Sequence, residues 1–317
     1  MIRAFVFPGQ GSQAVGMGKE LSDSSPHAKA VFDEVNDALN QDLSTLMFDG
    51  PIEDLTLTYN AQPALMASSI AVIRVLEHEF DTKLSDIADY VAGHSLGEYS
   101  AHAAAGTLNL SDTAKLLKLR GEAMQRAVPV GVGAMAAIMG AEFSVIEEIA
   151  AEAAIQAGGG QVCTAANDNA DGQVVISGHK EAVERAIEIA KERGIKRAIK
   201  LPVSAPFHCS LMQPAADEMA EALAATSFNA PSVPVITNVS ATPISDADQL
   251  RDQLVEQITG RVRWRETILK MGELDVTSLV EAGTGKVLSG LVRRINREIT
   301  GSSLQTLADI EAFVKEL

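Results

Sequence analysis

One hexapeptide, G-H-S-L-G-E at residues 93–98, limits the possible folds of this chain more than any other stretch. It follows a predicted strand at 89–92 and precedes a predicted helix from Glu98 to Ala105. This order is typical of a nucleophile elbow, whose tight turn needs glycine on both sides of the serine. The pattern predicts that Ser95 stands above the carboxyl edge of a parallel sheet and that the Leu96 N–H can stabilise an oxyanion. The alternative is an ordinary strand-to-helix turn with a capping serine.

The size and composition indicate a globular protein with a large domain and a smaller one, since 46% of the 317 residues are hydrophobic. The net charge of −16 argues against nucleic acid as the main partner. Two cysteines, Cys163 and Cys209, form no disulfide framework and fit a reducing compartment. We find no pattern of a signal peptide and no apolar run of transmembrane length, so we expect a cytoplasmic protein without a membrane partner.

The first part of the chain is predicted to alternate strands and helices. A strand at 3–7 precedes helices at 26–48 and 63–80, with Pro63 expected in a first helical turn and an irregular polar segment at 54–62. After the elbow, Ser111 is expected to cap a helix that runs to Ala127. Residues 129–133 are predicted to form a linker.

The middle of the chain predicts a small inserted domain. Strands are expected at 134–139, 162–166, 173–177 and 195–202, and helices at 143–156 and 179–193, with turns at 158–160 and 168–172. The order βαββαβ is typical of a ferredoxin-like unit. We therefore predict an inserted subdomain at 129–202 and a catalytic core made of 1–128 and 203–317.

The last part of the chain is predicted to return to the core. A loop at 204–209 leads to a helix at about 211–225, a strand at 234–238 and a helix at 249–258. A strand at 278–281, a helix after Lys286, a strand at 304–307 and a helix at 309–315 follow.

Two glycine-rich segments could suggest anion binding. The loop P-G-Q-G-S-Q at 8–13 follows the first strand, and such loops often present backbone N–H groups to an anion. The alternative is an ordinary β-to-α turn, which is favoured because the segment lacks the dinucleotide-binding pattern G-x-G-x-x-G. The cluster G-T-G-K at 283–286 is not a phosphate loop. Such a loop would need glycine in place of Val280 and Ser or Thr in place of Val287.

Arg120 is the unusual residue of the helix at 111–127, because it falls on the apolar face. A guanidinium cannot lose its charge there, so it needs an anionic partner. One interpretation is a structural ion pair with a carboxylate elsewhere in the chain. The other is that the partner is a carboxylate of the substrate, which the planar fork of arginine matches with two parallel hydrogen bonds.

A serine nucleophile needs a base, and histidine is the usual one. His208 is the best candidate by elimination, because it lies in a loop downstream of Ser95; a merely buried loop residue is the alternative. The other histidines are expected to be solvated (His27, His78, His179), packed (His102) or directed away from the serine (His94). No histidine has zinc-ligand spacing, so we expect no metal site.

Five segments in order resemble the malonyl-CoA:acyl carrier protein transacylase family of bacterial fatty acid synthesis. They are F-P-G-Q-G-S-Q at 7–13, G-H-S-L-G-E-Y at 93–99, Arg120, P-F-H at 206–208 and G-T-G-K at 283–286. The resemblance covers essentially the whole chain. It implies an α/β-hydrolase-like core with a mainly parallel sheet and an inserted ferredoxin-like subdomain, and a monomer without a cofactor.

The resemblance also implies a role for each matched residue. Ser95 would be the acylated nucleophile, His208 the general base and acid, and Arg120 the partner of the malonyl carboxylate. The N–H groups of Gln10 and Leu96 would form the oxyanion hole, and a carbonyl near Gln257 would orient the histidine in place of an acid. Cys209 and Thr284 depart from the family's frequent serine and proline, and neither touches the chemistry.

The implied reaction moves a malonyl group from malonyl-CoA to the phosphopantetheine thiol of acyl carrier protein through a malonyl-serine. Phe207 is expected to crowd an α-methyl group. The carrier would be acidic, and two basic clusters could receive it: one of Arg193, Lys196, Arg197 and Lys200, the other of Arg293, Arg294 and Arg297. The alternatives are a thioesterase or carboxylesterase on the same elbow, and a catalytically idle carrier-binding module.

Overall fold

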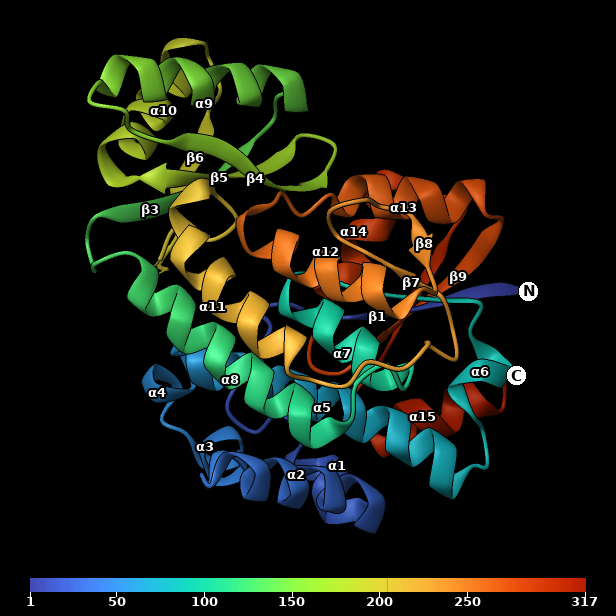
Figure 1. Cartoon of the computed structure of the whole chain (residues 1–317). Helices are drawn as coiled ribbons and strands as arrows, with labels where there is room; N and C mark the ends of the chain where they lie inside the picture. The colour runs from blue at the N-terminus through green and yellow to red at the C-terminus, as the bar shows by residue number, and fades with distance from the viewer. Residues whose placement is uncertain (204) are drawn as a thin grey trace.

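A mainly parallel sheet forms the centre of the protein, in a computed structural model that describes residues 1–203 and 205–317. Ser204, the first residue of the predicted 204–209 loop, lies outside the described residues. The strand order is β10-β9-β1-β2-β7-β8. Every neighbouring pair is parallel except β7 and β8 (Figure 1). The strands are β1 (Ile2–Phe7), β2 (Tyr90–Gly93), β7 (Val235–Ile236), β8 (Pro243–Ile244), β9 (Val276–Ala282) and β10 (Thr300–Leu304).

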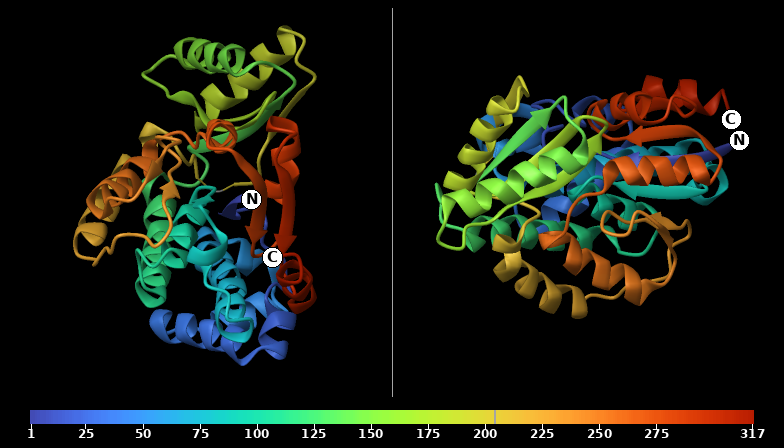
Figure 2. Two further views of the ribbon diagram at one scale, coloured as in Figure 1. Left: turned by 90° about the vertical axis from the view of Figure 1, so that its right-hand side faces the viewer. Right: turned by 90° about the horizontal axis from the view of Figure 1, so that it is seen from above.

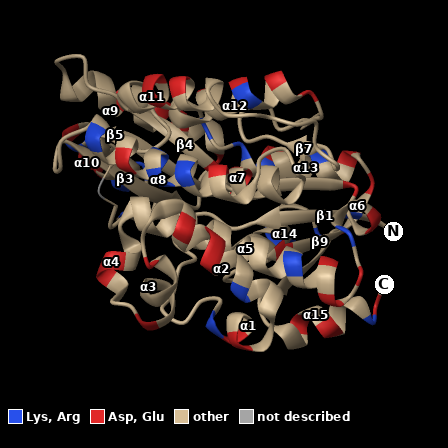
Figure 3. Cartoon of the chain, turned by 60° about the horizontal axis from the view of Figure 1, so that its bottom comes forward, with Lys and Arg blue, Asp and Glu red and all other residues tan. Residues whose placement is uncertain are grey.

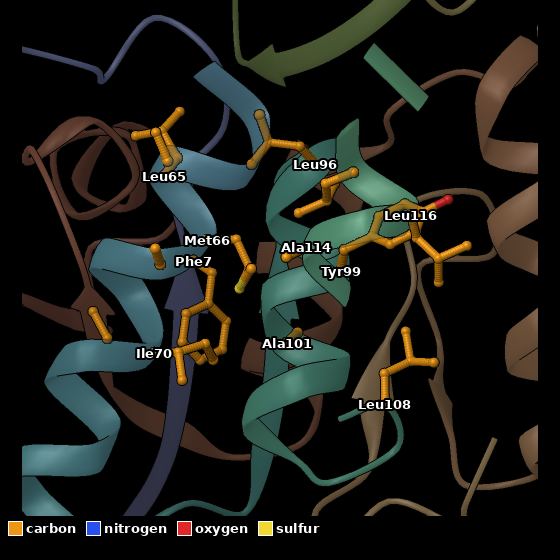
Figure 4. Close-up of a cluster of buried hydrophobic side chains, with 14 of the residues drawn as sticks. Phe7, Leu65, Met66, Ile70, Leu96, Tyr99, Ala101, Leu108, Ala114 and Leu116 are labelled. Carbon is orange, nitrogen blue, oxygen red and sulfur yellow. The ribbon is translucent and has the colours of Figure 1, made fainter. Parts of the chain in front are cut away.

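Strand β1 shows how the sequence buries both faces of this sheet. Its side chains alternate, so Phe5 and Phe7 belong to one apolar cluster and Ala4 and Val6 to another. The first cluster includes residues of α2 (Pro26–Leu39), α5 (Thr58–Glu79), α7 (Leu96–Ala104) and α8 (Leu110–Ala127). Figure 4 shows Phe7 among side chains of α5 and α7. The second includes residues of α13 (Trp264–Glu273) and α14 (Val287–Ile295).

A second, antiparallel sheet forms the small subdomain, in the order β4-β5-β3-β6. Its elements are β3 (Gly133–Met139), α9 (Phe143–Ala157), β4 (Cys163–Ala170), β5 (Gln173–His179), α10 (Lys180–Glu192) and β6 (Arg197–Lys200). One face of this sheet lies under α9 and α10, at the top of Figure 1. The order βαββαβ and the predicted fold class are therefore confirmed, whereas the boundaries at 129 and 202 stay a prediction.

The other face of the small sheet joins the core, since Met135, Ala137 and Val175 belong to the same cluster as Phe5. Strand β4 also pairs with the core segment before α13. The Asp168 N–H donates to the Val262 carbonyl at 2.9 Å, and the Val262 N–H donates to the Ala166 carbonyl at 2.8 Å. The two units consequently meet along β4. Figure 2 shows the whole chain from two further sides, with the subdomain in green to yellow.

Several predicted elements were wrong in their limits. The helix expected at 26–48 is two helices separated at Asn40, which has a φ of 47°. Helix α5 begins at Thr58, so Pro63 lies inside it, and α4 (Ile52–Thr56) occupies part of the segment expected to be irregular. The side chain that caps α8 is Asn109 rather than Ser111.

Two further corrections concern the second half. Strand β4 continues to Ala170 through two bulges, where a turn was expected, and β10 begins at Thr300 instead of 304. Helix α13 was not predicted. The remaining helices are α1 (Lys19–Ser24), α3 (Leu43–Asp49), α6 (Leu84–Ile87), the 3₁₀ turn η1 (Ser210–Met212), α11 (Gln213–Ala224), α12 (Ala247–Thr259) and α15 (Leu307–Val314).

Candidate active site

The turn at Ser95 is a tight elbow that only glycine permits on both sides. A Cβ on Gly93 would lie 1.9 Å from the carbonyl of Gly97, and a Cβ on Gly97 would lie 2.2 Å from the carbonyl oxygen of Phe7. Ser95 itself has φ 54° and ψ −112°, an uncommon conformation for a residue with a side chain. The strained turn holds the Ser95 hydroxyl above the carboxyl end of β2, at the N-terminus of α7.

The hydroxyl of Ser95 lies 2.7 Å from Nε2 of His208. The other ring nitrogen, Nδ1, lies 2.9 Å from the backbone carbonyl oxygen of Gln257 and 3.1 Å from that of Gly260. Because carbonyl oxygens only accept hydrogen bonds, they fix the tautomer with the proton on Nδ1. Nε2 is then a free acceptor for the serine proton.

Burial lowers the pKa of His208 to about 3, and the positive charge of Arg120 acts in the same direction. The ring is therefore neutral at physiological pH, which is the form a general base needs. Any negative charge that approaches Arg120 weakens its repulsion and makes His208 more basic.

Arg120 is buried beside this pair, with an exposed fraction of 1%. Its Nη2 donates to Ser95 Oγ at 3.1 Å and to Gln257 Oε1 at 2.9 Å, and its Nη1 donates to Gln62 Oε1 at 2.8 Å. Nε has no partner, and no carboxylate of the described residues forms an ion pair with the guanidinium. The structural ion pair considered from sequence is thus not found in the described part of the chain.

Amide side chains hold the site together. The Asn238 side chain accepts from the Ser95 N–H at 2.7 Å and donates to the Gly93 carbonyl at 2.6 Å. Gln257 donates to the Ser95 carbonyl at 3.0 Å and to Glu98 Oε2 at 2.9 Å. The sequence interpretation missed the side chains of Gln62, Asn238 and Glu98. Only Glu98 had a signal, its place in the elbow motif.

A cavity of about 350 Å³ opens above Ser95. It is bordered by the two residues whose N–H groups were predicted to form the oxyanion hole, Gln10 and Leu96, and by Arg120 and His208. Its apolar wall includes Met124, Met135, Val175, Leu201 and Phe207. The cavity lies between core and subdomain, and the oxyanion role of Gln10 and Leu96 stays a prediction.

Strand β4 of the subdomain reaches into this site. Asn167 and Asn169 both border the cavity, and Asn169 Oδ1 lies 2.8 Å from His94 Nε2. Between them, Asp168 points to Arg265, which donates to both carboxylate oxygens at 3.0–3.1 Å and forms an ion pair of 2.9 Å. The bidentate pair, with Asp168 only 2% exposed, fastens β4 to α13 beside the cavity above Ser95.

The remaining histidines take no part in this geometry. His102 is fully buried, as predicted, and burial lowers its pKa to about 3. His27 and His78 stack at the surface with ring centroids 4.9 Å apart. Among residues 1–203 and 205–317, no group of three or more His, Cys, Asp and Glu is arranged to hold a metal ion.

The chain matches a known family over most of its length. A family model described as "Acyl transferase domain" covers residues 4–306. Similar proteins include the malonyl CoA-acyl carrier protein transacylase of Bacillus subtilis (strain 168), which is 46% identical over 99% of this chain and 96% of its own. They also include that of Escherichia coli (strain K12), 47% identical over 95% of both chains.

Solved structures agree with this match. The acyl-carrier-protein-S-malonyltransferase from Bartonella henselae has a TM-score of 0.96 at 53% identity and covers 100% of this chain and 99% of its own. The protein is thus an acyltransferase with an elbow serine. The chain belongs to the malonyl-CoA–acyl carrier protein transacylase family. None of its described helices is long and apolar enough to cross a membrane.

Proposed function

We propose that this enzyme moves a malonyl group from malonyl-CoA to the phosphopantetheine thiol of acyl carrier protein in fatty acid biosynthesis. The observation that carries the proposal is the position of the Ser95 hydroxyl between His208 Nε2 at 2.7 Å and Arg120 Nη2 at 3.1 Å. A nucleophile, a neutral base and a buried cation without an ion-pair partner meet at one oxygen. This arrangement suits a thioester whose acyl group carries its own carboxylate.

In the first half-reaction, Ser95 Oγ attacks the thioester carbon and its proton passes to His208. The N–H groups of Gln10 and Leu96 hold the oxyanion, and each such donor typically contributes about 3–4 kcal/mol. The carbon–sulfur bond breaks, the proton on His208 passes to sulfur, and coenzyme A leaves as a thiol. The malonyl carboxylate pairs with Arg120, which also makes His208 more basic during the step.

In the second half-reaction, the carrier thiol gives its proton to His208 and attacks the malonyl ester. The proton then returns to Ser95. A solved relative, a malonyl-transacylase in complex with its type II PKS acyl-carrier protein, has a TM-score of 0.95 at 41% identity. It covers 100% of this chain and of its own. Its bound partner supports an acyl carrier protein as the acceptor here. Hydrolysis would make the enzyme a thioesterase, the second candidate.

Selectivity for malonyl over acetyl follows from Arg120, which an acetyl group would leave without an anionic partner. Phe207 borders the cavity beside the base and is proposed to crowd an α-methyl group. We propose no cofactor, because the reaction needs only proton transfer and oxyanion stabilisation. Monomeric state and a cytoplasmic location remain proposals from the family resemblance.

For carrier docking, we favour the cluster of Arg293, Arg294 and Arg297 at the end of α14. Arg293 and Arg297 form no hydrogen bond or ion pair with described residues and border a surface cavity of about 360 Å³. In the other cluster, Arg193 pairs with Glu152 and Glu148, and Lys200 pairs with Glu184 at 2.8 Å. The side chains of Lys196 and Arg197 have no hydrogen bond or ion pair with described residues either, so the surface cavity is what distinguishes the α14 cluster. Acidic positions are spread over α2, α4 and α11 (Figure 3).

Charge reversal tests this preference. Arg293→Glu with Arg297→Glu should raise KM for the carrier and leave the rate of acylation by malonyl-CoA unchanged. The matched control reverses Lys196 and Arg197. A larger effect in the control, or unchanged carrier kinetics in both variants, would refute the assignment to α14.

The proposed function itself is tested by intact-protein mass after brief mixing with malonyl-CoA, followed by addition of carrier protein. We expect one malonyl adduct, absent in Ser95→Ala, that is discharged onto the carrier. An adduct that decays in water without the carrier would identify a thioesterase. Absence of any adduct would point to an idle carrier-binding module.

A further inference from the structure

A second buried ionisable group lies beside the site and has no part in the proposed mechanism. Glu98, in the first turn of α7, has an exposed fraction of 0%. Its Oε2 accepts from Gln257 Nε2 at 2.9 Å and from the Asn238 N–H at 2.8 Å. Its Oε1 has no hydrogen-bond partner among the described residues. A buried carboxylate with half of its acceptors unused is costly and needs an electrostatic reason.

The side-chain amide of Gln257 lies between Glu98 and Arg120. Its Oε1 accepts from Arg120 Nη2 at 2.9 Å, and its Nε2 donates to Glu98 Oε2 at 2.9 Å. The amide dipole therefore points its oxygen at the cation and its N–H at the anion. Opposite charges are linked through one amide without a direct ion pair, and the backbone carbonyl of the same residue holds His208.

Few charges act on Glu98 from the surrounding elements. Arg120 of α8 favours the ionised carboxylate, and Tyr99, the next residue of α7, is a neutral phenol whose pKa burial raises. Gln257 of α12 and Asn238 after β7 are uncharged. Toward α5 and β1, the neighbours of α7 are apolar side chains such as Leu65, Met66 and Phe7 (Figure 4). Burial and the hydrogen bonds from Gln257 and Asn238 have the largest effects on the pKa of Glu98. Among the neighbouring charged groups, Arg120 is the one that favours its ionised form.

We infer that Glu98 is a positioning residue that serves as the resident counter-ion of Arg120 through Gln257, and that the substrate carboxylate takes over this role. When that carboxylate pairs with Arg120, Glu98 loses its compensation and takes up one proton from solvent. The inference rests on the proposed function, since it requires an acyl group with a free carboxylate. An acyl group without a carboxylate would leave Glu98 unchanged.

The consequence is a specific dependence of affinity on pH. Burial raises the pKa of Glu98 to about 7 in the free enzyme. Below that pH the Glu98 carboxyl is already protonated. Above it, the carboxylate must take up a proton when the substrate binds. By linkage, the dissociation constant of a malonyl thioester should rise about 25-fold from pH 6.5 to 8.5. An acetyl thioester carries the same coenzyme A and should show no such rise.

The test measures binding of malonyl-CoA and acetyl-CoA to the Ser95→Ala enzyme by isothermal titration calorimetry from pH 6.5 to 8.5. Buffers of different ionisation enthalpy report the protons taken up. Adding Glu98→Gln keeps an oxygen acceptor for Gln257 and Asn238 and removes only the charge. We expect the pH dependence and the proton uptake with malonyl-CoA to disappear in the double variant, whereas a merely structural role would leave both unchanged.

Two results would overturn the inference. One is an equal rise of the malonyl-CoA dissociation constant with pH in Ser95→Ala and in the double variant with Glu98→Gln. The other is a flat profile in Ser95→Ala while malonyl-CoA still binds more tightly than acetyl-CoA. The second needs no Glu98 variant, so it holds even where Glu98→Gln fails to fold. The enzyme could also bind malonyl-CoA no more tightly than acetyl-CoA, with Arg120→Ala leaving both dissociation constants unchanged. In that case the proposed function falls together with the inference.

Discussion

His102 should make the protein sensitive to acid, and replacing it should remove part of that sensitivity. The ring lies inside α7 with both nitrogens buried and without hydrogen-bond partners among the described residues. It contacts Phe228 edge-on, with ring centroids 6.2 Å apart. Burial lowers its pKa from the ordinary 6.5 to about 3, so the folded protein keeps it neutral where the unfolded chain protonates it.

The sign and size follow from this difference. When the pKa of a group is lower in the folded state than in the unfolded state, the unfolded state binds more protons than the folded state, here between about pH 6.5 and 3. Stability is lost as the pH falls through that window, by about 2 kcal/mol between pH 7 and 5 for one such histidine. Glu98 acts in the opposite direction because its folded pKa is raised to about 7. Because Glu98 is present in both proteins, the difference in unfolding free energy between wild type and a His102 variant isolates the contribution of His102.

We expect His102→Leu to gain about 2 kcal/mol of unfolding free energy relative to wild type on going from pH 7 to 5. Urea titrations followed by the fluorescence of Trp264, the single tryptophan and fully buried, measure this directly. His27→Leu, at an exposed position, is the matched control and should follow wild type. Parallel pH dependence of wild type and His102→Leu would refute the reasoning.

Other changes test the remaining contacts. Gly93→Ala should cost about 3 kcal/mol or more and abolish acylation, because its Cβ would lie 1.9 Å from the Gly97 carbonyl; a folded, active variant in thermal unfolding and mass assays would contradict the elbow geometry. Asp168→Asn should lower the free energy of unfolding by about 3 kcal/mol, because it breaks the ion pair with Arg265, whose carboxylate partner is 2% exposed. Unchanged urea unfolding would disprove the role of this pair in holding β4 to α13. Arg120→Ala should reduce kcat/KM for malonyl-CoA about 100-fold or more, with little change for acetyl-CoA, and equal losses for both substrates would argue against carboxylate recognition.

The parts of the fold and site that the sequence predicts are those with local signals. The elbow follows from glycine spacing around Ser95, and Arg120 stands out because a guanidinium interrupts an apolar helix face. His208 required elimination, since its contact with Ser95 joins residues 113 positions apart. The fold class was accessible because alternating strands and helices, with a βαββαβ insertion, allow few arrangements.

The residues that were missed depend on long-range contacts. Gln62 was placed in an irregular segment, yet it lies in α5 and holds Arg120. Asp168 and Asn169 fall in the sequence D-N-A-D-G, which is typical of a turn. The strand continues there because β4 pairs with Val262 and because Arg265 binds Asp168, partners about 95 residues away along the chain. No local pattern contains that information.

The use of amides and carbonyls at this site has one electrostatic explanation. A carboxylate beside His208 would orient the ring as well as the Gln257 carbonyl does, but it would also attract Arg120 and compete with a substrate carboxylate. Carbonyls and the amides of Gln62 and Gln257 orient the same groups without adding charge. Glu98 lies behind the Gln257 amide. It therefore balances the charge of Arg120 without occupying the side of the guanidinium that a substrate carboxylate would contact. Among the described lining residues, the cavity thereby presents one positive charge, that of Arg120, beside the proposed nucleophile Ser95. That is the condition for selecting an acyl group that carries its own anion.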